Sequence, residues 1–144
     1  MCIRDRSQVW DSIDQVGARR FIEALPNKLN FNVKERGASL SVGQRQLISC
    51  IRIMLYDPKI ILLDEATSSV DSETESMIQS AISKILKNRT SIVVAHRLST
   101  IKEVDNIIVL ENGEIKEIGD HNSLNKSGGY YRRLYEMQNK NILT

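Results

Sequence analysis

Residues 59–67 read Lys-Ile-Ile-Leu-Leu-Asp-Glu-Ala-Thr, a short aliphatic run that ends in two carboxylates. The run follows Asp57-Pro58, which ends the preceding helix because a residue before proline avoids the helical region. Four aliphatic residues between polar flanks predict a strand covered on both faces, as in a parallel sheet. The two carboxylates then lie at the carboxyl end of that strand, where open α/β sheets bind their ligands.

The sequence on either side alternates between helical and strand patterns. This predicts an α/β fold with a parallel sheet, flanking helices, an N-terminal helical lobe and a C-terminal β-hairpin at Asn112-Gly113. Ser41 is a good N-cap for one helix, and Ser72-Glu73-Thr74-Glu75 is a capping box for the next. The expected helices are about 7–25, 41–56, 72–86 and 129–139, and the expected strands are about 59–63, 90–95, 106–110 and 115–118.

Charge and composition argue against several classes of protein. The 20 basic and 18 acidic residues leave a net charge of +2, so no strong field indicates DNA or an anionic membrane as a partner. Aliphatic runs such as Ile60–Leu63 are far shorter than the ~20 residues of a membrane helix. Met1–Trp10 is charged and lacks the apolar core of a secretory signal. Cys2 and Cys50 have no partner motif, which fits a reduced, cytosolic compartment.

Asp64 and Glu65 have the chemistry that phosphate hydrolysis needs. A divalent metal on phosphate oxygens takes a hard anionic ligand, usually through water, and Asp64 supplies one. A base or water-orienting group one residue further along raises the rate by on the order of 10²–10⁴-fold, and Glu65 supplies that group. The alternative is structural: the two carboxylates only begin a surface loop. From these two residues alone, the structural and the catalytic interpretation are equally supported.

Residues 40–46 read Leu-Ser-Val-Gly-Gln-Arg-Gln and open a predicted helix. Free backbone N–H groups and the dipole at a helix start favour an anion, and the Ser41 hydroxyl can donate to it. Gly43 leaves room for a phosphate to approach the backbone closely. An ordinary N-cap explains Ser41 equally well, but not Gly43 and Gln44, because glycine in a first turn costs stability.

His96 follows the predicted strand Thr90–Ala95, at the same sheet edge as Asp64-Glu65. A lone histidine is more often structural than catalytic, but this position favours a catalytic role. His121 lies in a polar segment near the end of the chain, and we interpret it as structural.

The sequence has no phosphate-binding loop of the form Gly-x-x-x-x-Gly-Lys-Ser/Thr, because no glycine is followed by lysine. The other segments resemble the C-terminal portion of the nucleotide-binding domain of an ABC transporter, of the exporter type with a fused membrane domain. Residues 40–46 match the family signature Leu-Ser-Gly-Gly-Gln, with Val42 in place of its first glycine. Residues 60–65 match Walker B, residues 68–71 the D-loop and His96 the switch histidine; residues 95–101, 111–113, 117–121 and 128–135 extend the likeness.

This resemblance implies part of a P-loop NTPase core of the RecA-like type, which uses ATP and Mg²⁺. We expect residues 1–6 to stay unassigned and of non-native character, residues 7–56 to form a helical lobe that ends in the signature helix, and residues 57–144 to form the catalytic α/β lobe. The implied catalytic residues are Glu65 and His96, and Asp64 is the implied Mg²⁺ ligand, through water. The implied contacts to nucleotide on a second domain are Ser41, Gly43 and Gln44, and Asp71 of the D-loop links the two sites.

The implied partners are a second nucleotide-binding domain, paired head to tail, and the coupling helices of a membrane domain, with no nucleic acid. The implied location is the cytoplasmic face of the cell membrane. Walker A, the Q-loop glutamine and the adenine-stacking aromatic would precede Met1, so we expect the chain alone to be inactive. One alternative is a soluble ABC-type ATPase of DNA repair or chromosome maintenance, although no sustained heptads appear. A truncated, non-enzymatic chain is the other.

Overall fold

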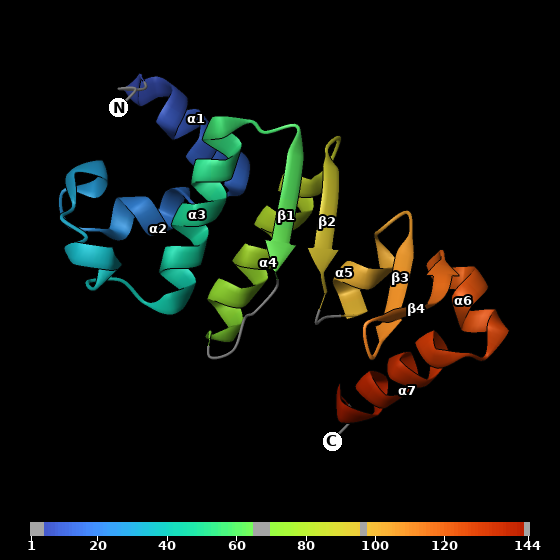
Figure 1. Ribbon diagram of the computed structural model, residues 1–144. Coiled ribbons are helices and arrows are strands. Elements are labelled where there is room, and N and C mark those ends of the chain that lie inside the picture. The colour runs from blue at the N-terminus through green and yellow to red at the C-terminus, as the bar shows by residue number, and fades with distance from the viewer. Residues whose placement is uncertain (1–4, 65–69, 96–97, 143–144) are drawn as a thin grey trace. The chain divides into compact units, whose positions relative to one another are not determined.

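The computed structural model describes residues 5–64, 70–95 and 98–142 (Figure 1). The chain divides into two compact units, Met1–Val93 and Val94–Thr144. The boundary falls near the end of the second strand, and helices before and after Tyr56 bury their apolar side chains in one core.

The helical elements of the first unit begin and end at recognisable capping residues. Asp5 accepts a hydrogen bond from the Ser7 amide at 3.2 Å and caps the first helix, which Gly17 ends in the left-handed region. Asp57, also left-handed, ends the longest helix of the N-terminal part. These elements are α1 (Arg6–Val16), α2 (Arg19–Ala24), the 3₁₀ turns η1 (Lys28–Asn30) and η2 (Glu35–Gly37), α3 (Val42–Tyr56) and α4 (Ser72–Leu86).

Two strands of the first unit, β1 (Ile60–Asp64) and β2 (Thr90–Val94), pair and run in the same direction (Figure 1). Alternate residues of a strand face opposite sides, so Ile61 is buried while Leu62 is 76% exposed. The sequence predicts strands covered on both faces. In the structure the described helices cover only one face of β1 and β2. The apolar side chains on the open face are Ile60, Leu62, Ile92 and Val94.

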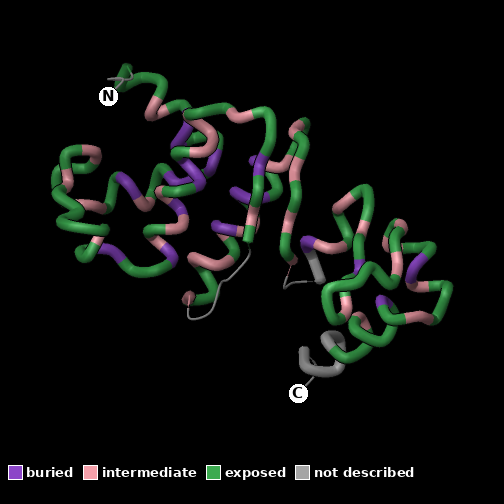
Figure 2. The backbone as a smooth tube through the Cα atoms, in the orientation of Figure 1, coloured by how far each residue is buried: buried purple, intermediate pink, exposed green. Residues whose placement is uncertain are grey.

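Helix α3 packs against both α1 and α4, and the three helices share a core with β1 (Figure 2). Ile13 of α1 and Leu47 of α3 are its most deeply enclosed large side chains. Cys50 lies on the same face of α3, and burial raises the pKa of its thiol to about 11, because a thiolate loses solvation there. The remaining core residues are Val16, Ala18, Ile22, Ile51, Ile61, Ile78, Ala81, Ile82 and Ile85.

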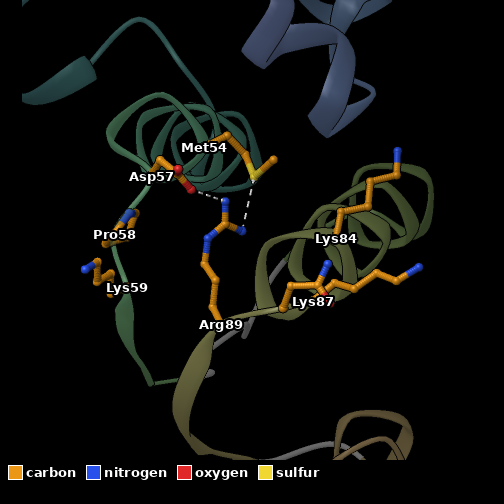
Figure 3. A pocket seen from close by; sticks show the side chains of 8 residues that line it. Met54, Asp57, Pro58, Lys59, Lys84, Lys87 and Arg89 are labelled. Atoms are coloured by element: carbon orange, nitrogen blue, oxygen red, sulfur yellow. Dashed lines mark hydrogen bonds and ion pairs between the residues drawn. The ribbon is translucent and has the colours of Figure 1, made fainter.

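Arg89, just before β2, joins the C-terminal ends of α3 and α4 (Figure 3). Its Nη1 donates to the Ile85 carbonyl at 2.6 Å and lies 3.9 Å from the Met54 sulfur, while its Nη2 donates to Asp57 Oδ1 at 2.7 Å. A shallow pocket of about 400 Å³ lies beside this side chain, and its other cations are the lysines 59, 84 and 87. The C-terminal end of a helix carries partial negative charge, and two such ends meet here. They explain why four cationic side chains gather at this place.

The second unit contains an antiparallel pair of strands, β3 (Ile107–Glu111) and β4 (Glu114–Gly119). The turn residues Asn112 and Gly113 have φ values of 52° and 78°, the left-handed conformations that a tight hairpin turn requires. Among the described residues, this pair forms a sheet separate from that of β1 and β2. The helices of this unit are α5 (Leu98–Lys102), α6 (His121–Ser127) and α7 (Tyr130–Ile142).

The carboxylate of Glu117 in β4 caps the first turn of α7. It accepts hydrogen bonds from the Tyr130 amide at 3.2 Å and the Tyr131 amide at 2.8 Å, and a Cβ at Gly129 would overlap it. His121 Nδ1 lies 2.6 Å from the Tyr131 hydroxyl, which agrees with a structural role for this histidine.

Candidate functional site

The first turn of α3 carries three of the predicted site residues, Ser41, Gly43 and Gln44. The Gln44 amide donates to Ser41 Oγ at 3.2 Å, and the Ser41 amide donates to Gln44 Oε1 at 3.0 Å. This is a capping box, in which two N–H groups without helical partners are satisfied reciprocally. Gln44 is thus explained by helix stability, and the Ser-x-x-Gln spacing in the sequence was the signal for it.

This capping box leaves hydrogen-bond donors at the start of α3. Both side chains use an oxygen as acceptor, so the hydroxyl hydrogen of Ser41 and the amide hydrogens of Gln44 keep their donor capacity. The amides of Val42 and Gly43 belong to the first turn, whose N–H groups have no acceptor within the helix. Ser41 and Val42 are exposed. Together with the helix dipole, these donors make the turn suited to an anion.

Gly43 is buried, and the structure gives a reason for glycine other than the approach of a phosphate. A Cβ here would lie 2.5 Å from Thr74 Cγ2 and 2.7 Å from Val70 Cγ1. Real Cβ atoms essentially never come within 3.0 Å of such neighbours, so only glycine lets α3 approach the start of α4 this closely. The structure thus gives a packing reason for this glycine, and the approach of a phosphate to its backbone stays a prediction.

Asp71 caps α4. Its Oδ2 accepts a hydrogen bond from the Thr74 amide at 2.9 Å, and the helix begins at Ser72. The capping box expected to begin at Ser72 is therefore wrong by one residue. Hydrogen bonds from the Thr74 amide and side chain hold the pKa of Asp71 below its usual value, because they stabilise the carboxylate. The contact at Gly43 thus places the predicted D-loop aspartate in the turn adjacent to the signature.

Asp64 ends β1 with an exposed side chain. Glu65 and His96, the two predicted catalytic residues, lie outside the described residues. Over residues 5–64, 70–95 and 98–142, no group of three or more metal-binding side chains occurs. Mg²⁺ keeps several waters and takes only one or two carboxylates when phosphates supply its other ligands, so a single exposed Asp64 fits that ion.

Arg45 braces the segment that leads into this turn, a role that the sequence did not reveal. Its Nη1 donates to the Leu40 carbonyl at 2.6 Å. Gly37 has a φ of 72°, and a Cβ there would lie 3.1 Å from Arg45 Cδ. Arg45 therefore fixes the chain between Gly37 and Leu40, immediately before Ser41. A bond from a side chain to a carbonyl five residues earlier has no sequence signature.

Comparison with known proteins places these elements in one family. The sequence model described as ABC transporter matches residues 2–68. The chain is 46% identical over 131 residues to a probable multidrug resistance ABC transporter ATP-binding/permease protein of Bacillus subtilis, covering 91% of this chain and 20% of that protein. It is 47% identical over 133 residues to the ATP-dependent lipid A-core flippase of Shewanella oneidensis, covering 92% of this chain and 22% of the flippase.

A solved structure has a similar fold. The structure of a bacterial Atm1-family ABC exporter with ATP bound aligns with a TM-score of 0.79 and 36% identity, over 93% of this chain and 23% of that one. The chain thus spans about a fifth of the length of the curated relatives that it matches. In the part of the chain that the structure describes, no helix is both long enough and apolar enough to cross a membrane.

Proposed function

Because this chain belongs to the ABC transporter family, as part of the ATP-binding domain, we propose that it acts on the γ-phosphate of ATP in a protein that exports a substrate across a membrane. The observation that carries this proposal is the start of α3, where the Ser41 hydroxyl, the side-chain NH2 group of Gln44 and the backbone N–H groups of Val42 and Gly43 remain available to an anion. Their position in the segment that resembles the family signature, within the residues that the family model matches, supports a nucleotide phosphate as that anion.

In this proposal two such domains pair head to tail, and the first turn of α3 in one contacts ATP held by the other. Ser41, Gly43 and Gln44 supply donors that are already oriented before the nucleotide arrives, because the capping box and Arg45 fix the turn. Oriented donors stabilise the charge on the phosphoryl group as it is transferred, which is the main requirement of this chemistry.

The hydrolytic residues act on nucleotide held by the same domain. Glu65 accepts the proton of the attacking water or orients that water, and His96 contacts the γ-phosphate side of the site. Asp64 would hold Mg²⁺ through water at the end of β1, and the ion would neutralise charge on the phosphate oxygens. Asp71, fixed as the cap of α4, lies beside the signature turn and links the two sites of the pair.

The open face of the β1–β2 sheet supports the view that this chain is part of a larger domain. Four aliphatic side chains on that face are between 56% and 76% exposed, an arrangement typical of a sheet whose second layer lies elsewhere in the polypeptide. The relatives are about five times longer, and we propose that preceding sequence supplies the phosphate-binding loop and the covering layer.

The proposed partners are a second ATP-binding domain and a membrane domain, whose coupling helices contact the α1–α2 region. The proposed location is the cytoplasmic face of the membrane. The identified relatives are transport proteins, which favours an exporter over a DNA-repair or chromosome-maintenance ATPase. The same relatives also argue against the other alternative, a truncated chain without any enzymatic role.

Replacement of Glu65 by glutamine in the full-length protein tests the proposal. We expect kcat for ATP hydrolysis to fall by at least about 10²-fold while ATP still binds, because glutamine keeps the size of glutamate but cannot accept the proton. Glu114→Gln is the matched control, since the side chain of Glu114 is exposed and forms an ion pair with Lys116. A Glu65→Gln protein that hydrolyses ATP at the wild-type rate would contradict the proposal.

A further inference from the structure

The first turns of α3 and α4 interlock at Gly43. The methyl group of Thr74 and one methyl of Val70 occupy the position of the missing side chain, at 2.5 Å and 2.7 Å from an ideal Cβ. Gly43 is helical and has no positive φ, so the glycine serves this close approach and not a special backbone conformation.

Each side of the interlock is a capped helix start. On α3, Gly43 lies between Ser41 and Gln44, whose side chains and amides are bonded to each other. On α4, the Thr74 amide donates to Asp71 Oδ2, and the Glu75 amide donates to the Asp71 carbonyl at 2.9 Å. The Thr74 methyl therefore belongs to the same rigid turn as the Asp71 carboxylate. A displacement of the α3 turn would push on that methyl and move Asp71 with it.

We infer that Thr74 is a positioning residue, whose methyl group, packed on Gly43, couples the placement of Asp71 to the engagement of the signature turn by MgATP on a partner domain. The inference rests on the proposed function, because it assigns the two turns to two nucleotide sites. Asp71 alone could connect the two nucleotide sites across the interface between the two domains. The coupling inferred here is different, because it runs within one chain, from Gly43 to the Thr74 methyl and on to Asp71. A contiguous packed contact is one route for such coupling, and protein interiors are dense enough to transmit a displacement through it.

The competing explanation is that Gly43 and Thr74 are ordinary packing. Loss of ordinary packing lowers the amount of folded enzyme, which scales the maximal rate and leaves the shape of the ATP saturation curve unchanged. Loss of coupling between sites changes the shape of that curve. The ATP dependence of hydrolysis therefore separates the two explanations.

Thr74→Ser and Thr74→Val in the full-length protein form a matched pair. Serine keeps the hydroxyl and loses the methyl that fills Gly43, whereas valine keeps that methyl and loses the hydroxyl. We expect Thr74→Ser to lower the Hill coefficient for MgATP towards 1 and to raise the half-saturating ATP concentration by on the order of five-fold, the lower end of typical coupling effects. We expect Thr74→Val to keep the wild-type Hill coefficient, because the backbone amide of residue 74 still bonds Asp71 although the hydroxyl contact to that carboxylate is lost. Identical curves for the two variants would overturn the inference.

A rescue experiment provides a second test that does not depend on the stability of one variant. Gly43→Ala places a Cβ against both methyls, and we expect it to lose ATP-dependent cooperativity. Adding Thr74→Ser and Val70→Ala removes both methyls and relieves the overlap, so the triple variant should fold stably but should not regain the wild-type Hill coefficient, because the contact is no longer made. Full restoration of cooperativity by the triple variant would overturn the inference. A wild-type protein that hydrolyses no ATP, or a Glu65→Gln variant that is fully active, would instead refute the proposed function.

Discussion

The guanidinium of Arg89 donates to the Ile85 carbonyl of α4 and to Asp57 at the end of α3, so one side chain closes two helix ends (Figure 3). The two bonds differ in environment. The Arg89 side chain is 14% exposed, whereas that of Asp57 is 79% exposed. Solvent screens an exposed ion pair strongly, so the bond to the carbonyl contributes more to stability than the ion pair does.

Arg89→Met should therefore destabilise the ends of α3 and α4, and Asp57→Asn should not. Methionine keeps much of the apolar volume but leaves a helix-end carbonyl without its donor, at a cost of about 1–3 kcal/mol. Asparagine keeps the left-handed conformation of residue 57 and removes only an exposed charge, at a cost of about 0–1 kcal/mol.

Hydrogen–deuterium exchange of the full-length protein measures this difference. Peptides covering residues 53–60 and 84–92 should exchange faster in Arg89→Met than in the wild type, and at the wild-type rate in Asp57→Asn. Equal protection in the two variants would show that the hydrogen bond to the Ile85 carbonyl contributes no more to stability than the ion pair with Asp57.

The helices of this chain differ in how completely local sequence determines them. The start of α3 at Ser41, its end at Asp57 and the end of α4 at Leu86 all follow from capping residues and helical periodicity. The approach of α3 to α4 at Gly43 does not, because it depends on side chains that follow β1 in the sequence. The same holds for Arg45, whose bond to the Leu40 carbonyl satisfies no propensity or pattern rule.

The N-cap of α4 predicts an acid-sensitive helix. The pKa of Asp71 is lowered in the fold from its usual 3.8, mainly by the hydrogen bond from the Thr74 amide. A lowered pKa means that the cap stabilises the helix fully above about 3.8 and that this contribution is lost as the pH falls through the folded pKa. Protonation removes the charge that the helix N-terminus favours.

Circular dichroism of a peptide with the sequence of residues 70–87 checks this expectation at low temperature. Helicity should decrease as the pH falls from 5 to 2, and the decrease should be smaller in Asp71→Asn, which caps without titrating. Glu73 and Glu75 also titrate in the first turn, so the difference between the two peptides is the informative quantity. A difference that does not change with pH would contradict the assigned cap.

The complete chain joins a well-enclosed helical core to a sheet with one uncovered aliphatic face. The α/β class, the order of the elements and the family could all be predicted from the sequence, because each depends on local patterns and short motifs. The division into two units near the end of β2 depends on which helices share a core, and no local sequence pattern carries that information. The sequence did not predict that helices cover only one face of β1 and β2. A strand of aliphatic residues has the same sequence pattern whether helices cover one face of it or both.

We expect the 144-residue chain alone not to bind ATP tightly. Most of the binding energy for a triphosphate comes from the amides and the lysine of a phosphate-binding loop, and this sequence contains no such loop. Isothermal titration calorimetry with MgATP measures the affinity. A dissociation constant in the micromolar range would contradict this prediction, and the full-length protein is the positive control.

We also expect the isolated chain to aggregate or to bind hydrophobic dye. Ile60, Leu62, Ile92 and Val94 form a contiguous exposed aliphatic face, and β1 and β2 have no further partner strand among the described residues. Replacing Leu62 and Ile92 by threonine should reduce dye binding without altering the buried face. A sharp, cooperative thermal transition from a soluble wild-type monomer would show that these residues form a self-sufficient fold.

Cys50 gives a way to follow the core of the first unit in a crude membrane preparation. A thiol reacts as the thiolate, and Cys50 is both enclosed by apolar side chains and shifted to a pKa of about 11. Alkylation at this residue therefore requires α3 to leave the core. After Cys2 is replaced by serine, the rate of maleimide labelling, measured on the peptide that contains Cys50, reports how often that opening occurs without denaturant.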